Sequence, residues 1–364
     1  MLYANVVLGL PIDGPFDYLV PVGLETKLQI GARVWVDFRN KKEIAYVVAL
    51  NNKTKIKKLK EIISSIDSVP ILDEGMLALT KELAEYYCCS WGEAIEAALP
   101  DELRKGKEAA VGLLSPPLNQ QRAGNDGVIE KKDRVLFVQG VDRIPVYLRE
   151  IKKVLAAKES VIILCNNIPA VKRLKEIIQQ SLAVEAFIAF RKQPKELEVW
   201  ERIRKTDYCV VVGTRSSIFS CVNNLGLIII DQPEDPVYKQ EQVPHYHARE
   251  VALMRAQIQN VKVILGSISL SLESFYLWQK GRLGLENIPP KLAYPLVKVI
   301  DLRRLAYAER KSKSMFSKFL ADAIQLTLAE KGKVLLVINR KGFATTVACQ
   351  NCQKSLKCPR CNIN

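Results

Sequence analysis

The hydrophobic pattern in the middle of the chain is typical of buried parallel strands. Short apolar runs, rich in β-branched residues, occur at 135–138, 161–164, 209–212 and 225–230. Runs of this length and composition suit strands covered on both faces of a sheet. A segment with helical spacing at 170–180 follows one of them. Alternating strands and helices predict an α/β fold with a doubly wound parallel sheet over residues 134–285.

The first hundred residues have a different pattern, which predicts a small β-rich domain ending in a helix. Residues 31–38 alternate apolar and polar side chains, as in a strand with one buried face. The stretches 5–10 and 44–50 are further strand candidates, and residues 72–87 have helical spacing.

The rest of the chain predicts a linker and an incomplete second lobe. Residues 101–133 mix charges without periodicity and contain Pro and Gly turn signals, which is typical of a linker. Within 286–364, we expect strands at 297–303 and 334–338 and a helix at 319–330.

The charge of the chain favours a polyanionic partner. Its 364 residues include 54 Lys and Arg against 39 Asp and Glu, giving a net charge of +15. Nucleic acid is the simplest such partner, and a merely solvated lysine-rich surface is the alternative. No run of about 18 apolar residues and no signal-peptide pattern is found, so we expect a cytoplasmic protein with no membrane partner.

The nine cysteines divide into two groups. Five are scattered through apolar or helical stretches and are expected to be small core residues; these are Cys88, Cys89, Cys165, Cys209 and Cys221. Four form two Cys-x-x-Cys pairs, at Cys349 and Cys352 and at Cys358 and Cys361. Paired cysteines at this spacing predict a zinc site with thiolate ligands rather than disulfides.

Two strand ends in the predicted parallel sheet carry candidate chemistry. Thr214, Arg215 and Ser216 follow the run at 209–212, and Asp231 ends the run at 225–230. Ligands of such sheets lie beyond the carboxyl ends of the strands. An aspartate there can hold Mg²⁺ against a nucleotide phosphate, although it can equally cap the strand.

The sequence motifs around these residues resemble those of the helicase core of the bacterial replication-restart helicase family PriA. The resemblance rests on Gly213–Ser216, Leu225–Asp231, Tyr238–Gln240, Tyr246–Arg249, Leu265–Ser274 and Val334–Ala344 with the paired cysteines after it. It covers most of the chain. It implies a RecA-like helicase lobe at 134–285 and a partial second lobe with a zinc-type insertion at 286–364. The winged-helix domain of the family is not expected in the short linker.

The N-terminal hundred residues resemble the family's domain that captures a DNA 3′ end. Carried over, the pocket for the terminal nucleotide consists of Phe16, Asp17, Tyr18 and Lys60. A carboxylate can accept a hydrogen bond from a free 3′-OH, and an aromatic face can stack on the last base. The alternative is that Asp17 is a turn residue and the aromatic residues belong to the core.

The ATPase motifs of the family are not intact. The phosphate-binding pattern Gly-x-x-x-x-Gly-Lys-Thr is replaced by a shortened loop that begins at Gly140 and contains Asp142. The lysine for the β- and γ-phosphates and the hydroxyl for Mg²⁺ are both missing. Gln232 follows Asp231 where the family has a glutamate, and a glutamine cannot accept a proton from water. We therefore expect Asp231 to be a vestigial Mg²⁺ position and no ATP hydrolysis.

The DNA-contacting motifs are better preserved. In the family, the motif matched by Thr214, Arg215 and Ser216 contacts the single-strand backbone. A second group matches its aromatic-rich loop and is expected to stack on bases or contact phosphates: Tyr238, Lys239, Tyr246 and Arg249. The family carries four cysteine pairs and two zinc ions, so two pairs allow one rearranged zinc site at most, or two incomplete ones.

These observations predict a protein that binds branched or single-stranded DNA at stalled replication forks and supports replication restart without ATPase activity. The resemblance implies primosome components and single-strand-binding proteins as partners. One alternative is an active 3′→5′ helicase with a non-standard nucleotide site. Another is a non-catalytic interaction scaffold or a remnant.

Overall fold

A computed structural model describes residues 1–56, 58–109, 134–182, 184–289, 296–301 and 316–337. The chain divides into two compact units, Met1–Ala293 and Tyr294–Asn364. Each unit is described by itself below.

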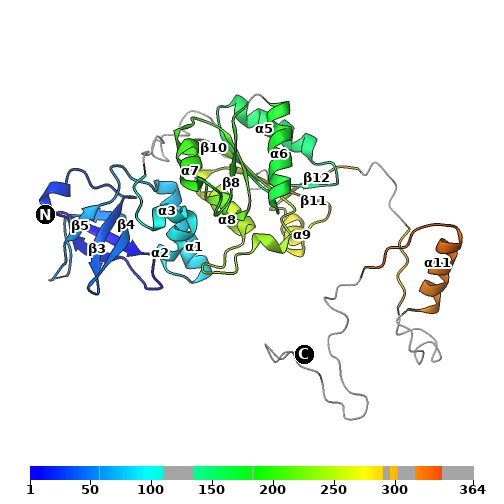
Figure 1. Cartoon of the computed structure of the whole chain (residues 1–364), viewed down its shortest axis with the longest axis horizontal. Coiled ribbons are helices and arrows are strands. Elements are labelled where there is room, and N and C mark those ends of the chain that lie inside the picture. Colours follow the sequence, from blue (N-terminus) through cyan, green and yellow to red (C-terminus); the bar gives the residue numbers. More distant parts are fainter. Residues whose placement is uncertain (57, 110–133, 183, 290–295, 302–315, 338–364) are drawn as a thin grey trace, which may run out of the picture. The chain divides into compact units, whose positions relative to one another are not determined.

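The chain begins with a five-stranded antiparallel sheet (Figure 1). Its strands are β1 (Tyr3–Leu8), β2 (Phe16–Leu19), β3 (Arg33–Phe38), β4 (Lys41–Asn51) and β5 (Ile62–Ser65), in the order β2-β1-β4-β3-β5. A short 3₁₀ helix, η1 (Val22–Leu24), lies between β2 and β3. The inward-facing side chains of these strands, such as Val6, Val34 and Val47, form one buried cluster. The predicted β-rich start of the chain is confirmed.

Three helices follow this sheet: α1 (Glu74–Tyr87), α2 (Trp91–Ala98) and α3 (Asp101–Arg104). The helix α1 begins where the Asp73 side chain accepts a hydrogen bond from the Met76 amide. It ends at Cys88, which has the left-handed backbone conformation. Ser90 and Glu93 form a reciprocal capping box at the start of α2.

Seven parallel strands form the second sheet, in the order β12-β6-β11-β10-β7-β9-β8. Their bounds are β6 (Val135–Gln139), β7 (Ser160–Leu164), β8 (Ala186–Ala189), β9 (Val210–Gly213), β10 (Leu225–Asp231), β11 (Lys262–Ser267) and β12 (Gly284–Asn287). The connecting helices are α5 (Ile144–Ala156), α6 (Ile168–Ser181), α7 (Glu196–Lys205), α8 (Ala248–Gln259) and α9 (Leu272–Gln279), with the 3₁₀ helices η2 (Arg215–Phe219) and η3 (Pro236–Tyr238).

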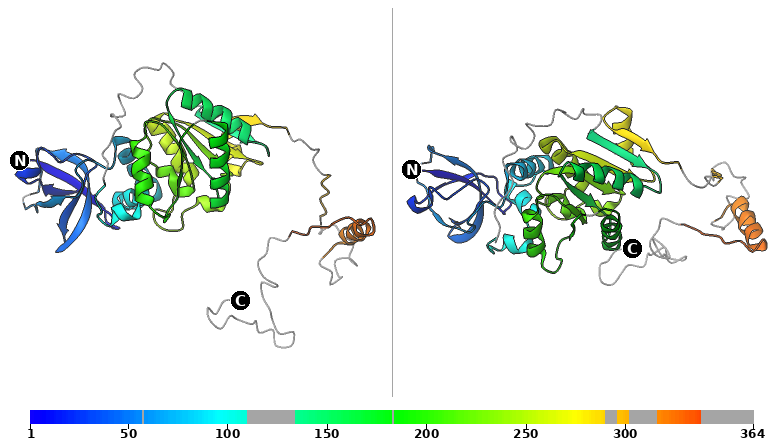
Figure 2. Two further views of the ribbon diagram at one scale, coloured as in Figure 1. Left: turned by 45° about the horizontal axis from the view of Figure 1, so that its top comes forward. Right: turned by 90° about the horizontal axis from the view of Figure 1, so that it is seen from above.

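Helices cover both faces of this sheet (Figure 2). Because alternate side chains of a strand point to opposite faces, each strand contributes to two cores. In β10, Leu227 and Ile229 pack in the cluster that contains residues of α5 and α6. Ile228 and Ile230 pack in the cluster that contains residues of α7 and α8. The predicted doubly wound α/β fold is confirmed.

The N-terminal helices and the parallel-sheet region share one hydrophobic core. Side chains of α1 and α2 belong to the same buried cluster as those of α7 and α8. Leu103 and Ala109, which fall in the predicted linker, are 0% and 3% exposed. The stretch 101–109 is therefore anchored to the fold by these two apolar side chains, while its charged residues Lys105, Lys107 and Glu108 are exposed. The remainder of that predicted linker, 110–133, lies outside the described residues.

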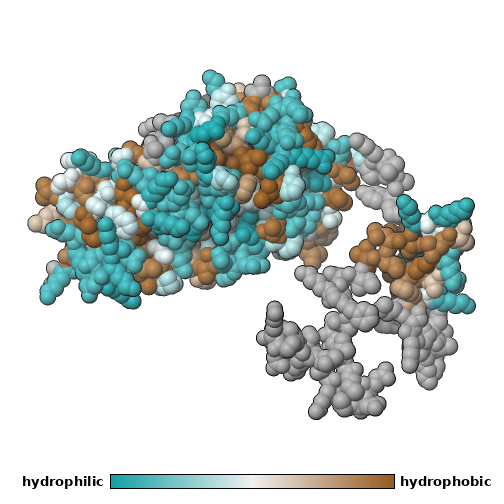
Figure 3. Space-filling model, viewed as in Figure 1, coloured by the Kyte–Doolittle hydropathy of each residue, from teal (hydrophilic) through white to brown (hydrophobic). Residues whose placement is uncertain are grey.

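The second unit contains the helix α11 (Lys318–Ala329), which confirms the helix predicted at 319–330. Apolar side chains gather in the region of α11 in Figure 3, and Leu326 of this helix is 63% exposed. The strands predicted at 297–303 and 334–338 are wrong as far as the structure describes them. Neither residues 296–301 nor residues 334–337 form a strand. Leu335 is 87% exposed, so among the described residues this apolar run has no neighbouring strand to bury it.

The five cysteines expected in the core differ in their burial. Cys165, Cys209 and Cys221 are buried, Cys89 is half-buried, and Cys88 is exposed, so the core prediction is wrong for Cys88. Its position at the end of α1, with positive φ, turns it towards the surface. In the described part of the chain, no helix is long and apolar enough to span a membrane.

Candidate functional site

The carboxyl edge of the parallel sheet brings Asp231 next to the loop that follows β6. Asp231 pairs with Gly266 of β11, and Gly266 pairs in turn with Val138 of β6. The Gly140 amide donates to the Ser267 carbonyl at 2.9 Å, which fixes the start of that loop. Asp231 therefore lies beside the loop that begins at Gly140.

Two side chains from the start of α5 donate hydrogen bonds to the Asp231 carboxylate. Arg143 donates to Asp231 Oδ1 from Nε at 3.1 Å and from Nη2 at 2.9 Å. The Tyr147 hydroxyl donates to the same oxygen at 2.8 Å. Burial, and then the Asp231 carboxylate, raise the pKa of Tyr147 well above its ordinary value, so the hydroxyl stays protonated as a donor.

This arrangement opposes binding of Mg²⁺ at Oδ1 of Asp231. An oxygen that accepts three hydrogen bonds has little capacity left for a metal ion, and the guanidinium repels a cation. The N-terminus of α5 would ordinarily offer free amides to an anion, but Pro145 lies in its first two positions and has no N–H. A side chain on Gly266 would collide with Tyr147, since a Cβ there would lie 1.6 Å from the hydroxyl. Asp231 is thus the acceptor of a structural ion pair.

Gln232 and Glu234, the residues near the position of the family's catalytic glutamate, are held by polar partners. Gln232 has a positive φ of 55°, and its side-chain oxygen accepts a hydrogen bond from Asn166 at 2.8 Å. The exposed Glu234 accepts a hydrogen bond from the Ser267 hydroxyl. Gln232 keeps a defined orientation but offers no base for water.

Arg215, next to the strand end at Thr214, forms hydrogen bonds to the aromatic-rich loop, which contains Tyr238, Lys239 and Tyr246. Its Nη1 donates to the carbonyls of Val237 at 2.8 Å and Lys239 at 2.6 Å. Its guanidinium carbon also lies 5.9 Å from the centre of the Tyr246 ring. Planar guanidinium groups suit such paired acceptors. The contacts in the structure are therefore those of a residue that positions the loop.

The rings of Tyr238 and Tyr246 are buried rather than open to a base. Tyr238 is 0% exposed, and its hydroxyl donates to the carbonyls of Leu164 at 3.1 Å and Asp231 at 2.6 Å. Tyr246 is 3% exposed and packs edge-on against Phe219, with 5.1 Å between ring centres. Neither ring presents a face for stacking in this structure.

The other predicted DNA contacts differ in exposure. Lys239 is exposed, and its ammonium lies 5.1 Å from the centre of the Tyr87 ring. Arg249 is 9% exposed and is paired with Glu250 at 2.9 Å. Thr214 and Ser216 are half-buried at the surface of a cavity. Of this group, Lys239, Thr214 and Ser216 remain accessible to a ligand.

The predicted 3′-end residues lie on and next to β2. Tyr18 is buried, Phe16 packs against Phe38 with 5.3 Å between ring centres, and Lys60 pairs with Asp37 at 3.0 Å. Successive side chains of a strand point to opposite faces, so Asp17 lies on the face opposite Phe16 and Tyr18.

The Asp17 carboxylate itself has two protein partners. The Asn5 side-chain amide, directly opposite on β1, and the Thr54 hydroxyl both donate to it. The described contacts place Asp17 in a polar group of its own and do not join it to Lys60. Whether the four residues receive a DNA end together stays a prediction.

The four cysteines predicted to bind zinc, Cys349, Cys352, Cys358 and Cys361, lie outside the described residues. In the part of the chain that the structure describes, no group of three or more His, Cys, Asp or Glu side chains is arranged to hold a metal ion.

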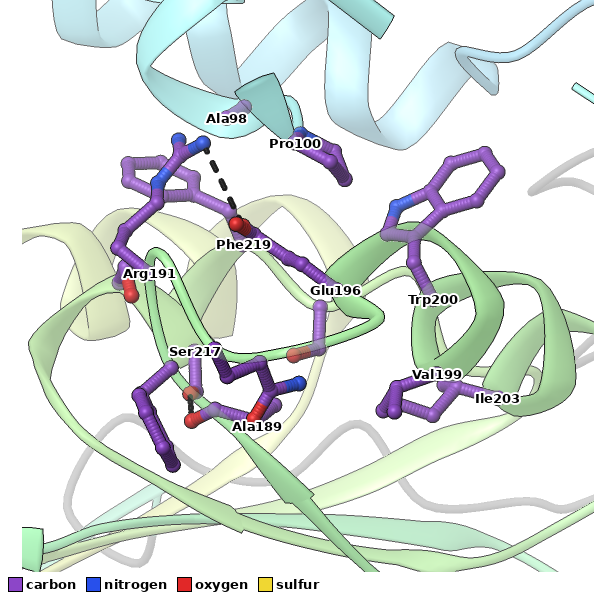
Figure 4. Close-up of a pocket in the computed structure, with 14 residues that line it drawn as sticks. Ala98, Pro100, Ala189, Arg191, Glu196, Val199, Trp200, Ile203, Ser217 and Phe219 are labelled. Carbon is purple, nitrogen blue, oxygen red and sulfur yellow. Dashed lines mark hydrogen bonds and ion pairs between the residues drawn. The ribbon is translucent and has the colours of Figure 1, made fainter. Parts of the chain in front are cut away.

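Arg143, Tyr147 and Arg191 are residues of the site that sequence reasoning missed. Arg191, on the loop after β8, donates to the carbonyls of Leu99 and Ala97 at the end of α2. It lines a small pocket of about 50 Å³ that Trp200, Phe219 and Pro100 also line (Figure 4). An arginine after a parallel strand was a signal in the sequence, but its partners are 92 and 94 positions away.

The architecture defines the class of protein: a doubly wound parallel α/β region preceded by a small domain with an antiparallel sheet. Residues 5–100 match the family model described as the 3′DNA-binding domain (3′BD) of PriA. The replication restart protein PriA of Treponema pallidum is 28% identical over 99% of this chain and 57% of its own length. That of Haemophilus influenzae is 26% identical over 99% of this chain and 62% of its own. The chain is PriA-like along nearly its whole length.

The chain spans about three-fifths of the length of these two relatives. PriA of Bacillus subtilis is 32% identical over 68% of this chain and 32% of its own length. Among solved structures, the Pyrococcus furiosus Hef helicase domain aligns with a TM-score of 0.33 at 13% identity, covering 44% of this chain and 36% of that one.

Proposed function

We propose that this PriA-like chain binds DNA at stalled replication forks, supports replication restart and does not hydrolyse ATP. The 3′BD match over residues 5–100 supports the DNA-binding part of the proposal. The net charge of +15 supports it further, because release of counterions from phosphates favours binding by a basic protein.

The lack of hydrolysis rests on the hydrogen bonds that Arg143 and Tyr147 donate to Asp231. A nucleotide-bound Mg²⁺ at Oδ1 would have to displace both side chains, and at either oxygen it would meet the positive charge of Arg143. Nothing in the loop after Gly140 would compensate for that loss, since it contains neither a lysine nor a threonine.

The test is ATP hydrolysis by the purified chain, with and without a forked DNA that has a free 3′-OH end. We expect binding of the fork without DNA-stimulated turnover. The control is Asp231→Asn, which keeps an acceptor but removes the charge that Mg²⁺ needs. Fork-stimulated turnover that elutes with the chain on a sizing column would overturn the proposal. Its loss in Asp231→Asn would assign it to this site, and its persistence would assign it to a nucleotide site that does not need Asp231.

Two further parts of the proposal follow from the resemblance to PriA. Primosome components and single-strand-binding proteins are the proposed protein partners. A zinc ion held by the four C-terminal cysteines remains a prediction that metal analysis of the purified chain would test.

A further inference from the structure

A cavity of about 580 Å³ lies between the N-terminal helices and the loops of the parallel-sheet region. This volume is in the range of about 300–1,000 Å³ that is common for small-ligand sites. The helix α2 contributes the carboxylates of Glu93 and Glu96. The loops after β8 and β9 contribute Lys192, Thr214 and Ser216. The cavity thus combines acceptors from one part of the fold with a cation and hydroxyls from another.

Most of the charged groups in this cavity already have partners. Arg104 pairs with Asp101, Arg191 donates to the end of α2, and Arg215 holds the aromatic-rich loop. Lys192 is exposed, and its ammonium makes no ion pair with the residues that the structure describes. It is therefore the lining cation that is available to an anionic ligand.

The hydroxyl groups next to Lys192 are also available. The side chains of Thr214 and Ser216 are half-buried and make no hydrogen bond within the described part of the chain. The neighbouring Ser217, in contrast, donates its hydroxyl to the Ala189 carbonyl. One ammonium and two hydroxyls are the kind of side chains that contact a nucleic-acid phosphate.

Of the two carboxylates on α2, Glu96 is the one that takes no part in the helix cap, and the Tyr46 hydroxyl lies beside it. Glu93 Oε2 accepts a hydrogen bond from the Ser90 amide at 3.0 Å in the capping box. The Glu96 carboxylate lies against Gly9, where a Cβ would be 1.9 Å from its oxygen. Burial, which outweighs the effect of Arg104, raises the pKa of Glu96 above its ordinary value. A ligand that donates hydrogen bonds would therefore stabilise the ionised carboxylate of Glu96.

We propose that this cavity holds one nucleotide of single-stranded DNA, with its phosphate at Lys192, Thr214 and Ser216 and its base at Glu96. The proposal rests on the proposed DNA-binding function. Guanine is the preferred base, because its Watson–Crick edge places an N–H and an amino group side by side. Two adjacent donors match the two oxygens of a carboxylate, whereas adenine, cytosine and thymine place an acceptor beside their donor.

The test is the fluorescence anisotropy of dT₁₂ oligonucleotides with one central dG, dC or dT. A 3′-terminal fluorescein removes the free 3′-OH, so capture of a DNA end does not contribute. We expect the dG oligonucleotide to bind at least about fivefold more tightly than the dT one, as for other paired hydrogen bonds to a base. Glu96→Gln should remove this preference, while Glu85→Gln, an exposed residue of α1, should keep it.

Lys192→Ala tests the phosphate contact independently. It should weaken binding of the three oligonucleotides alike and reduce the salt dependence of binding by about one charge. Lys195→Ala, three residues away and paired with Glu198, should do neither. An equal affinity of the wild-type chain for the three oligonucleotides, or a dG preference that survives Glu96→Gln, would overturn the cavity proposal alone. Failure of the wild-type chain to bind any of them, or the fork, would overturn the proposed function as well.

Discussion

Nη2 of Arg143 lies 2.9 Å from Oδ1 of Asp231, across 88 positions of the sequence. The two side chains are 9% and 26% exposed, so the pair is largely removed from water. It joins the helix that follows the first strand of the parallel sheet to the strand end where a helicase would hold its metal ion. The contact stabilises the sheet edge, and under the proposed function it takes the carboxylate that nucleotide-bound Mg²⁺ would need.

We predict that Arg143→Met lowers the free energy of unfolding by about 2–4 kcal/mol, because it leaves the Asp231 charge without its partner in a partly buried site. Urea denaturation followed by circular dichroism measures this. The control is Arg202→Met, since the Arg202 side chain is 65% exposed and pairs with Glu185 at the surface. Its cost should stay below about 1 kcal/mol. Equal costs for the two variants would contradict a special role of the Arg143–Asp231 pair.

The second prediction concerns Arg215 as the residue that holds the aromatic-rich loop. Arg215→Ala should speed tryptic cleavage after Lys239, because the carbonyls of Val237 and Lys239 lose their donor. Arg215→Lys should restore little, since an ammonium lacks the planar geometry of the guanidinium. Limited proteolysis followed by mass spectrometry gives the rates. Cleavage at Lys205, outside the loop, provides the internal reference. If the ratio of the cleavage rates at Lys239 and Lys205 is the same in the variant and the wild type, the prediction is wrong.

The sequence predicted which strand ends meet at the carboxyl edge of the parallel sheet, but not the side-chain contacts made there. The β-branched runs ending at Gly213 and Asp231 revealed buried parallel strands, and parallel strands necessarily bring their carboxyl ends together. The pairing of Arg143 with Asp231 depends on how distant strands are ordered in the sheet, which local pattern does not contain. Tyr238 lies in a polar loop, so its pattern fitted an exposed ring as well as the buried one observed.

The third prediction separates stability from DNA binding at Tyr238. Tyr238→Phe removes the hydroxyl that donates to the carbonyls of Leu164 and Asp231 and should cost about 1–3 kcal/mol of stability. Because the ring is fully buried, affinity for single-stranded DNA should change less than about twofold. Tyr86→Phe, on a ring that is 60% exposed, should leave stability unchanged. A large loss of DNA affinity in a folded Tyr238→Phe protein would show that the ring becomes exposed on binding.

Stability should depend on pH through Glu150, a carboxylate surrounded by Lys153, Lys262 and Arg149. Burial alone would raise its pKa, but hydrogen bonds from these three cations lower the pKa to about 2. A carboxyl whose pKa is lower in the folded state stabilises the fold above its unfolded pKa of about 4.3, and this contribution is lost as pH falls towards 2.

The difference in unfolding free energy between the wild type and Glu150→Gln should accordingly be constant from pH 7 to about pH 5 and shrink below it. Urea denaturation at several pH values measures this difference. The control is Glu85→Gln, whose exposed carboxyl should give a difference near zero throughout. A difference that stays constant down to pH 3 would show that the three cations do not act on Glu150.

The last prediction concerns the DNA 3′ end. If Asp17 accepts a hydrogen bond from a free 3′-OH, Asp17→Ala should weaken binding of a fork with that end about tenfold and leave binding of a 3′-phosphate fork unchanged. Asn5→Ala should lower the preference for the 3′-OH less, because Asn5 only orients the carboxylate. Asp13→Ala, on the exposed turn before β2, is the control for charge alone. Since Asp17 and the Phe16 ring lie on opposite faces of β2, Phe16→Ala should not abolish the discrimination between the two ends. If it does while Asp17→Ala does not, the aromatic face of the strand, and not the carboxylate, recognises the end.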